Sequence, residues 1–410
     1  MVGVYMKKGN VKYKKPNPIV YKCFYWASSL LCKFKFNLKY LRNEVKDVKG
    51  PFVVIANHEA SIDFISVAAA VKRRIHFVIS NSFYESLSIQ PLLKSAGVIP
   101  KNQYQTMVED LKKMKLCIDN GMPIAIFPAG LMSADGITMP IPASTGKSLK
   151  WFDQDVYVAK SSGSYLTCPK WSKKMRKGQM TIDVYKLFTK EQLREMNEKD
   201  VQKEIEKALY YDAYQNQLNN PVAYKNGDDI VGFENVLYQC PSCKKEFTMA
   251  VENKSTIKCS NCGYEATADV YGLFNKSGEN EVYKLPSEWY AMIVNELKKV
   301  IDNTENYTLK DECEVYKINK KKHKFEKSFD ALITLDSEKF TLSGDINGED
   351  FYKEFSTAIF PTLPFSPGKY FELQEKKDVY RIYLKNGREV TKWIIALKIF
   401  FENRLNSKNQ

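Results

Sequence analysis

Short apolar runs alternate with amphipathic stretches through the middle of the chain. Strands are predicted at 52–56, 75–79, 98–99, 124–127, 156–160 and 180–185, and helices at 62–71, 88–96, 103–120 and 189–217. In the helix at 103–120, Met107, Leu111, Met114 and Ile118 recur at spacings of three and four, which is typical of one helix face. Such alternation predicts an α/β domain over about residues 51–220, with a mostly parallel central sheet flanked by helices.

The pattern changes after residue 220. Residues 230–275 carry two Cys-x-x-Cys pairs, and residues 284–410 contain short strands between helices at about 286–301 and 390–405. Turn sequences such as Ser366-Pro367-Gly368 divide these strands. We therefore expect a small four-cysteine zinc ribbon and then a β-rich domain with a C-terminal helix. The order of strands and helix in that last domain resembles a pleckstrin-homology-like module.

Composition places the chain among globular proteins. Hydrophobic residues make up 44% and charged residues 27% of the sequence. The longest apolar runs are far shorter than the roughly 20 residues that a membrane-spanning helix needs. The chain does not open with a signal peptide, so we expect its nine cysteines to lie in a reducing cytoplasm.

Positive charge is concentrated at the start of the chain. The net charge is +14, and residues 1–50 hold 12 Lys and Arg against Glu44 and Asp47. Aromatic residues such as Trp26 and Phe34 interleave with these cations. This composition favours basic aromatic helices that lie on an anionic membrane surface. A nucleic-acid-binding arm, or a packed helix whose lysines extend to solvent, remains an alternative.

A candidate catalytic pair follows the strand at 52–56. Asn57 and His58 begin a loop, and Asp63 stands five residues after His58 at the start of a predicted helix. A carboxylate in this place can orient the imidazole of a general base. The arrangement Asn-His-x-x-x-x-Asp resembles the signature of the PlsC-like glycerolipid acyltransferases, the lysophosphatidic acid acyltransferase family.

A second block resembles the same family. Phe127-Pro128-Ala129-Gly130-Leu131-Met132-Ser133 follows a predicted strand and is similar to the family's Phe-Pro-Glu-Gly-Thr-Arg-Ser block, which helps to hold the acceptor's glycerol phosphate. Ala129 and Met132 replace the Glu and Arg of that block. Lys101 occupies the place of a basic residue that contacts phosphate in the family. The nearby Ser144–Lys147 segment and the lysine cluster at 170–177 are candidates to replace the missing Arg, or to form a solvated or membrane-facing edge.

The cysteine pairs have the spacing of a metal site. Cys240 and Cys243 form one pair and Cys259 and Cys262 the other, with 15 residues between the pairs. Four thiolates at this spacing can close a tetrahedron around Zn²⁺, and such a closed site is structural, not catalytic.

The resemblance implies an acyltransferase that needs no catalytic cofactor. An acyl group would pass from acyl-CoA or acyl-carrier protein to the hydroxyl of a lysophospholipid, with His58 as base and Asp63 as its orienting partner. Asn57, or backbone N–H groups at the start of the helix after His58, are expected to stabilise the oxyanion, and Glu59 is expected to face solvent. The expected location is cytoplasmic, on the inner face of the cell membrane. The alternatives are a different lysolipid headgroup, a non-catalytic lipid-binding scaffold, and a zinc-ribbon protein that binds nucleic acid, which the sequence disfavours.

Overall fold

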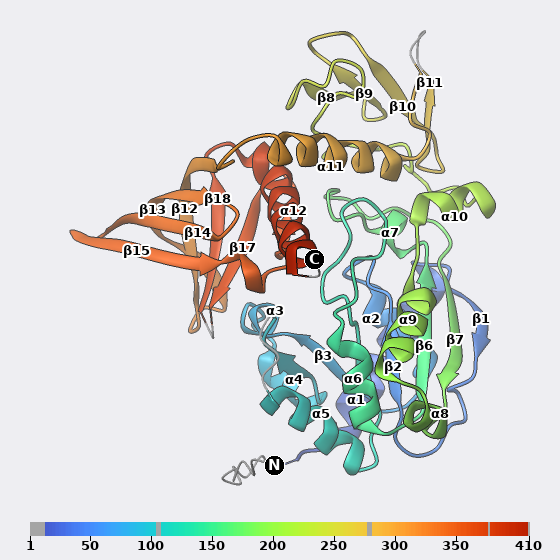
Figure 1. Cartoon of the computed structure of the whole chain (residues 1–410). Coiled ribbons are helices and arrows are strands. Elements are labelled where there is room, and N and C mark those ends of the chain that lie inside the picture. Colours follow the sequence, from blue (N-terminus) through green and yellow to red (C-terminus); the bar gives the residue numbers. More distant parts are fainter. Residues whose placement is uncertain (1–12, 104–107, 277–280, 376–377, 409–410) are drawn as a thin grey trace.

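The chain folds into an α/β part, a small four-stranded sheet and a second seven-stranded sheet (Figure 1). The computed structural model describes residues 13–103, 108–276, 281–375 and 378–408. In this view the small sheet lies at the top with α11 below it, the C-terminal sheet lies at the left and the α/β part at the lower right. The basic residues before position 13 and Met107 of the predicted helix at 103–120 lie outside the described residues.

The α/β part is built on a sheet with the strand order β1-β7-β6-β2-β5-β3-β4. Strands β6, β2, β5, β3 and β4 run parallel to one another, while β7 and β1 run the opposite way. The bounds are β1 Lys39–Asn43, β2 Val53–Ala56, β3 His76–Ser80, β4 Ile99–Lys101, β5 Ile124–Ile126, β6 Val156–Ser162 and β7 Thr181–Phe188. The predicted mostly parallel sheet is confirmed.

Helices cover both faces of this sheet, which explains why its central strands are apolar throughout. Val54 and Ala56 of β2 pack in one buried cluster with Val67 of α2, while Val53 and Ile55 pack in another with Ile118 of α5. The helices are α1 Pro18–Phe34, α2 Asp63–Val71, α3 Asn81–Glu85, α4 Gln90–Ser95, α5 Val108–Asp119, α6 Ser144–Phe152, α7 Ser164–Thr167, α8 Lys190–Glu195, α9 Glu198–Leu209 and α10 Ala213–Asn219. None of the helices in the described part of the chain is long and apolar enough to cross a bilayer.

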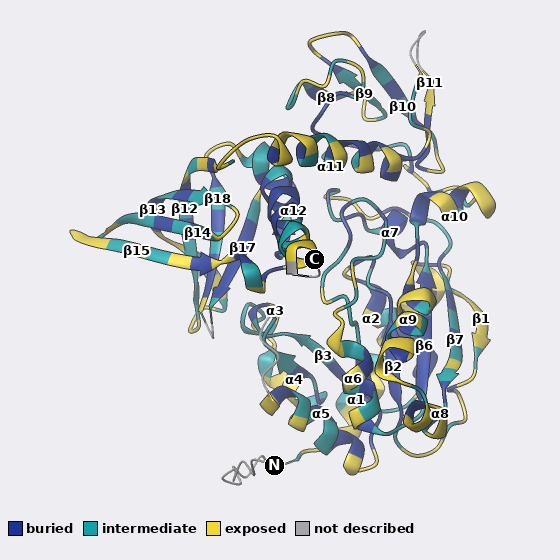
Figure 2. Cartoon of the chain, in the orientation of Figure 1, coloured by how far each residue is buried: buried dark blue, intermediate teal, exposed yellow. Residues whose placement is uncertain are grey.

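Two predictions for the α/β part were wrong in detail. Residues 39–43, expected in an interfacial helix, form the edge strand β1, which Figure 2 shows as exposed. The single helix predicted at 189–217 is three helices. Asn197 and Asp212 each cap a new helix with their side chains, which breaks the helical run, and the apolar residues Val201, Ile205 and Leu209 spaced by four all lie within α9. The capping box predicted at Thr189 and Gln192 is confirmed.

The C-terminal region is rich in strands and ends in a helix, as predicted. Its sheet has the order β15-β14-β13-β12-β18-β17-β16. The bounds are α11 Pro286–Asp302, β12 Leu309–Asn319, β13 Lys324–Leu335, β14 Lys339–Ile346, β15 Glu349–Ser356, β16 Phe365–Ser366, β17 Tyr370–Glu375, β18 Asp378–Leu384 and α12 Val390–Lys408. The small sheet before it comprises β8 Met249–Glu252, β9 Thr256–Cys259, β10 Glu265–Ala268 and β11 Phe274–Lys276. That this region is a pleckstrin-homology-like module stays a prediction.

The three parts pack against one another. One buried cluster runs from Tyr165 and Tyr214 of the α/β part, through Tyr264 of the small sheet, to Trp393 of α12. His323, predicted to be a surface residue, is half-buried at the β12–β13 turn and lies 3.1 Å from the amide of Gln90 on α4. The C-terminal sheet therefore contacts the α/β part beside the helices that follow β3.

Candidate functional site

His58 and Asp63 form a hydrogen-bonded pair at the carboxyl end of β2. Nδ1 of His58 lies 3.1 Å from Oδ2 of Asp63. That oxygen also accepts hydrogen bonds from the backbone N–H groups of Glu59, at 2.7 Å, and Ala60, at 2.9 Å. Asp63 is fully buried, whereas 22% of the His58 side chain is exposed. The carboxylate is thus fixed by the loop it helps to shape, and the imidazole reaches the surface.

This geometry sets the proton positions on the ring. A carboxylate oxygen only accepts hydrogen bonds, so the proton that joins the pair lies on Nδ1 of His58. Nε2 then keeps its lone pair and points away from Asp63. This is the arrangement of a general base held in one tautomer by a buried carboxylate.

The second sequence block lies beside the imidazole. Strand β5 is the direct neighbour of β2, and the rings of Phe127 and His58 are 4.8 Å apart between centroids. The N–H of Gly130 donates to the carbonyl of Phe127 at 3.0 Å, which closes a tight turn through Pro128. Gly130 has a φ of 68°, a conformation that glycine adopts without strain. Two motifs far apart in sequence therefore meet at one edge of the sheet.

Ser133 is placed differently from what the sequence predicts. Its hydroxyl is buried, donates to Asp135 at 2.9 Å and accepts from the N–H of Gly136 at 2.7 Å. These contacts hold the loop after the Phe127 turn in shape. We therefore assign Ser133 to the loop structure and not to the substrate.

Lys101 ends β4, the outermost parallel strand. Strands β2, β5, β3 and β4 lie in this order, so β4 is three strand spacings, roughly 14 Å, from the strand that carries His58. Gln103, just after β4, donates to the carbonyl of Gly130 at 3.1 Å, which joins this strand end to the Phe127 turn. Lys101 is half-buried, and burial lowers its pKa against the opposing effect of Asp110. The imidazole thus lies at the carboxyl end of the central strand, and Lys101 at the carboxyl end of the outermost parallel strand.

Asn57 does not present a free amide to this edge. Its side chain accepts from the N–H of Ser161 and donates to the carbonyl of Ser161, both at 2.8 Å, which ties the His58 loop to β6. The backbone N–H groups of Glu59 and Ala60 are also occupied, by Asp63. The expectation that Asn57 stabilises an oxyanion is therefore wrong, because both of its amide groups are engaged, while such a role for backbone N–H groups at the start of α2 stays a prediction.

Glu59 was expected to face solvent, and this is also wrong. It is fully buried, and its carboxyl lies 2.9 Å from the hydroxyl of Thr138. Burial raises its pKa, and the charge of Asp63 raises it further. The sequence gives no signal for this contact because Thr138 stands 79 positions away.

Helix α1 backs the His58 loop and carries an exposed apolar face. Cys32 and Phe36 pack with Ala60 and Ile62 in one buried cluster. On the other side of the helix, large apolar side chains are exposed: Ile19, Trp26, Leu30, Leu31 and Phe34. An open hollow of about 480 Å³ lies at the end of α1, where Phe34 and Lys35 meet Met175 and Lys177. The candidate site is thus one helix layer away from an apolar and basic surface.

Ser144–Lys147, considered above as a phosphate site, has another role. These residues form the first turn of α6, and the N–H of Gly146 donates to the side chain of Gln202 on α9 at 3.0 Å. Of the lysine cluster, Lys170 donates to the carbonyl of Met132 at 3.3 Å and lies 3.7 Å from the ring centroid of Phe365. The C-terminal sheet therefore touches the loop that follows the Phe127 turn.

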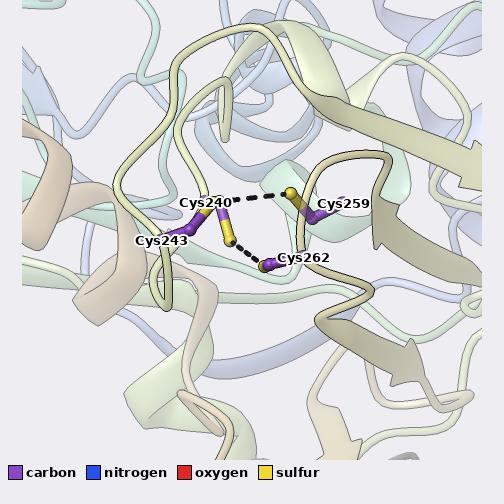
Figure 3. A group of neighbouring side chains, drawn as sticks. All are labelled: Cys240, Cys243, Cys259 and Cys262. Atoms are coloured by element: carbon purple, nitrogen blue, oxygen red, sulfur yellow. Dashed lines mark hydrogen bonds between the residues drawn. The ribbon is translucent and has the colours of Figure 1, made fainter.

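The four cysteines gather into one cluster (Figure 3). Their sulfur atoms all lie within 4.8 Å of one another, with Cys240 and Cys262 3.6 Å apart and Cys243 and Cys259 3.8 Å apart. Four sulfurs around Zn²⁺ at bond lengths of about 2.3 Å are separated by roughly 3.8 Å. Both the number of donors and their spacing fit a metal ion such as zinc.

Comparison with known proteins agrees with the class of site described above. Residues 36–157 match the model of the family described as Acyltransferase, and this segment contains His58, Asp63, Lys101 and the Phe127 turn. This part of the chain is therefore similar to acyltransferases.

Among solved structures, the chain is similar to the 1-acyl-sn-glycerophosphate (LPA) acyltransferase, PlsC, from Thermotoga maritima. The two share 17% sequence identity with a TM-score of 0.36, over 47% of this chain and 77% of the other. No match was found among curated proteins.

Proposed function

We propose that this protein transfers a fatty acyl group from acyl-CoA or acyl-carrier protein to the hydroxyl of a lysophospholipid. The observation that carries the proposal is the His58–Asp63 pair beside the Phe127 turn, within the segment that matches acyltransferases. Acyl-CoA carries phosphates and acyl-carrier protein is acidic, so a chain with a net charge of +14 attracts either donor.

The reaction needs one proton transfer to His58 and one proton transfer from it. Nε2 of His58 takes the proton of the acceptor hydroxyl as its oxygen attacks the thioester carbonyl. Asp63 stabilises the imidazolium that forms. When the tetrahedral intermediate collapses, the C–S bond breaks and the imidazolium returns its proton to the leaving thiolate. An ester and a free thiol result, without an acyl-enzyme.

The acceptor is the open part of this proposal. Ala129 and Met132 stand where the family's block has Glu and Arg, so a 1-acyl-glycerol-3-phosphate or a lysolipid with another headgroup is the expected acceptor class. The test is to incubate the protein with acyl-CoA or acyl-carrier protein and a panel of lysolipids, and to measure thiol release. Acceptor-dependent release supports the proposal, whereas no turnover with any acceptor favours a lipid-binding scaffold.

Lys101 is proposed to bind the phosphate of the acceptor. Replacing it with Met should raise KM for a phosphate-bearing lysolipid by about 10–100-fold, because a charge-assisted hydrogen bond contributes about 1.5–3 kcal/mol. The kcat value should change much less, and Lys101→Arg should recover part of the affinity. Steady-state kinetics checks this, with Lys94→Met on exposed α4 as the control. An equal loss in both Met variants would contradict the role of Lys101.

We further propose that α1 and the basic residues around it bind an anionic membrane surface, on the inner face of the cell membrane. Reversing two exposed cations, Lys33→Glu with Lys35→Glu, should weaken binding to anionic vesicles by at least about 30-fold, since each lysine near the surface contributes about 1 kcal/mol and each new carboxylate is repelled. Vesicle flotation at low and high salt measures this. The matched control is Lys203→Glu with Lys207→Glu on α9. Equal binding of wild type to neutral and anionic vesicles would contradict the proposal.

The four cysteines are proposed to hold a structural Zn²⁺. A closed set of four thiolates leaves no coordination position for a substrate, so the metal would contribute to folding and not to the acyl transfer. Its place in the fold supports this role, because α11 and the short turn that leads into α12 both contact the segments that carry the cysteines. Arg388 donates to the carbonyls of Phe247 and Met249, and Trp289 donates to the carbonyl of Gln239.

A further inference from the structure

Glu59 connects the His58 loop to the loop after β5. Its Oε1 lies 2.9 Å from the hydroxyl of Thr138 and 3.3 Å from the side-chain amide of Asn57. Asn57 is itself bonded to Ser161 of β6, and Thr138 belongs to the chain that follows the Phe127 turn. The amide of Asn57 therefore joins the His58 loop to β6, and the carboxyl group of Glu59 joins the same loop to the loop after β5.

The hydrogen bonds of Thr138 indicate which partner holds the proton. Besides Glu59, its hydroxyl has two acceptors within reach, the carbonyls of Leu209 and Tyr211, both at 3.2 Å. A hydroxyl has a single proton. If it donates that proton to a backbone carbonyl, its oxygen is free to accept one from Glu59. With a neutral Glu59, the acid donates to Thr138 and Thr138 donates to a backbone carbonyl. With an ionised Glu59, the single proton of Thr138 would serve either the carboxylate or a carbonyl, and the other acceptor would have no donor.

The hydrogen bonds of the neighbouring Asp63 also indicate that the proton is on Glu59. Oδ2 of Asp63 accepts three hydrogen bonds, which stabilise an ionised carboxylate. Glu59 has no ion pair among the described residues. Within this part of the chain, its Oε2 and the Oδ1 of Asp63 are both buried without a hydrogen-bond partner, so the difference between the two carboxyl groups lies in the three hydrogen bonds to Oδ2 of Asp63. Two neighbouring buried carboxyl groups do not both ionise readily, and the hydrogen bonds to Oδ2 favour the negative charge on Asp63.

We propose that Glu59 is a positioning residue: a neutral carboxylic acid that donates to Thr138 and holds the His58–Asp63 loop in its working geometry. This inference rests on the proposed acyltransferase function. It leaves Asp63 as the one negative charge behind His58, so that the imidazolium formed during proton transfer has a single, fixed partner.

The ionisation state of Glu59 depends on the charged and titratable groups around it. These are His58 in its own loop, Asp63 of α2, Lys160 of β6, Asp135 in the loop after β5 and Tyr211 after α9. Lys160 and the hydrogen bonds with Thr138 and Asn57 favour the carboxylate. Burial, which has the largest effect, and the two aspartates oppose it, and the pKa of Glu59 lies well above its ordinary value as a result.

The raised pKa of Glu59 determines how the stability of the fold changes with pH. A folded protein that keeps Glu59 protonated binds one more proton than the unfolded chain once the pH exceeds the ordinary pKa of a glutamate. Its stability contribution is therefore fully present below that value and is lost as the pH rises towards the folded-state pKa. Glu59→Gln, which mimics the neutral acid, should not suffer this loss.

The test compares wild type, Glu59→Gln, Glu59→Ala and the exposed control Glu195→Gln. We expect the difference in Tm between Glu59→Gln and wild type to grow from pH 5 to pH 8, and the control to follow wild type at every pH. In acyl transfer, Glu59→Gln should keep kcat within a few-fold and stay active at alkaline pH values where wild type declines. Glu59→Ala should lose about 10–100-fold in kcat, with a smaller change in KM, because the base is less well placed.

Each outcome decides one part of the proposal. A Tm difference that does not vary with pH would overturn the neutral state of Glu59. A Glu59→Gln protein as slow as His58→Ala would overturn the positioning role, since a carboxylate would then be required. If wild type transfers no acyl group to any lysolipid, the proposed function fails, while the Tm series still decides whether Glu59 is neutral.

Discussion

Replacing His58 with alanine is expected to lower kcat/KM for acyl transfer by about 10²–10⁴-fold, the usual contribution of a general base. The change removes the only group at this loop that can accept the acceptor's proton, while Asp63 keeps its two backbone hydrogen bonds. The fold should therefore survive, and steady-state thiol release alongside thermal unfolding measures both effects.

A second histidine provides the matched control. His323 is also half-buried but lies at the β12–β13 turn, against α4. The variant His323→Ala should retain the wild-type kcat. If His58→Ala turned over as fast as His323→Ala, with an intact fold, the imidazole at position 58 would have no part in the reaction.

Replacing Cys259 with serine is expected to remove the metal and destabilise everything that packs on the small sheet. Wild type should contain about one zinc per chain, and the variant close to none. Zinc bound to short four-ligand peptides contributes about 10–16 kcal/mol to folding, so losing a buried thiolate should lower Tm strongly. Metal analysis and thermal unfolding measure this.

The effect should reach beyond the cysteines because their sheet shares its core with the rest of the chain. The ring of Trp289 on α11 packs edge-on against Tyr264, which stands two residues after Cys262. The control is Cys23→Ser, an exposed thiol on α1 outside the cluster. Full retention of zinc and Tm in Cys259→Ser, equal to the control, would contradict the proposed site.

The parts of the fold that follow local patterns were predictable from the sequence. Strands such as Val53–Ala56 are short, wholly apolar and bounded by turns, because both of their faces are covered. The cysteine cluster was predictable because its ligands come in two fixed pairs. The place of His58 beside Phe127 followed from a resemblance, and only the strand order shows why the two meet.

Other features depend on partners distant in sequence. Strand β1 has almost no buried side chain, and it is held by parallel pairing with β7 and by Arg42, whose guanidinium binds Asp183. The burial of Glu59 depends on Thr138, and the engagement of Asn57 depends on Ser161. No periodicity within residues 57–63 records these contacts, so the sequence could identify the motif but not which of its polar groups are occupied.

The most direct test of the central claim is to identify the product of wild-type protein incubated with an acyl thioester and a lysophospholipid. We predict a new ester on the lysolipid hydroxyl, formed one for one with free thiol, and absent when His58→Ala replaces wild type. Thiol release without a new ester, or an ester formed equally by both proteins, would contradict the account.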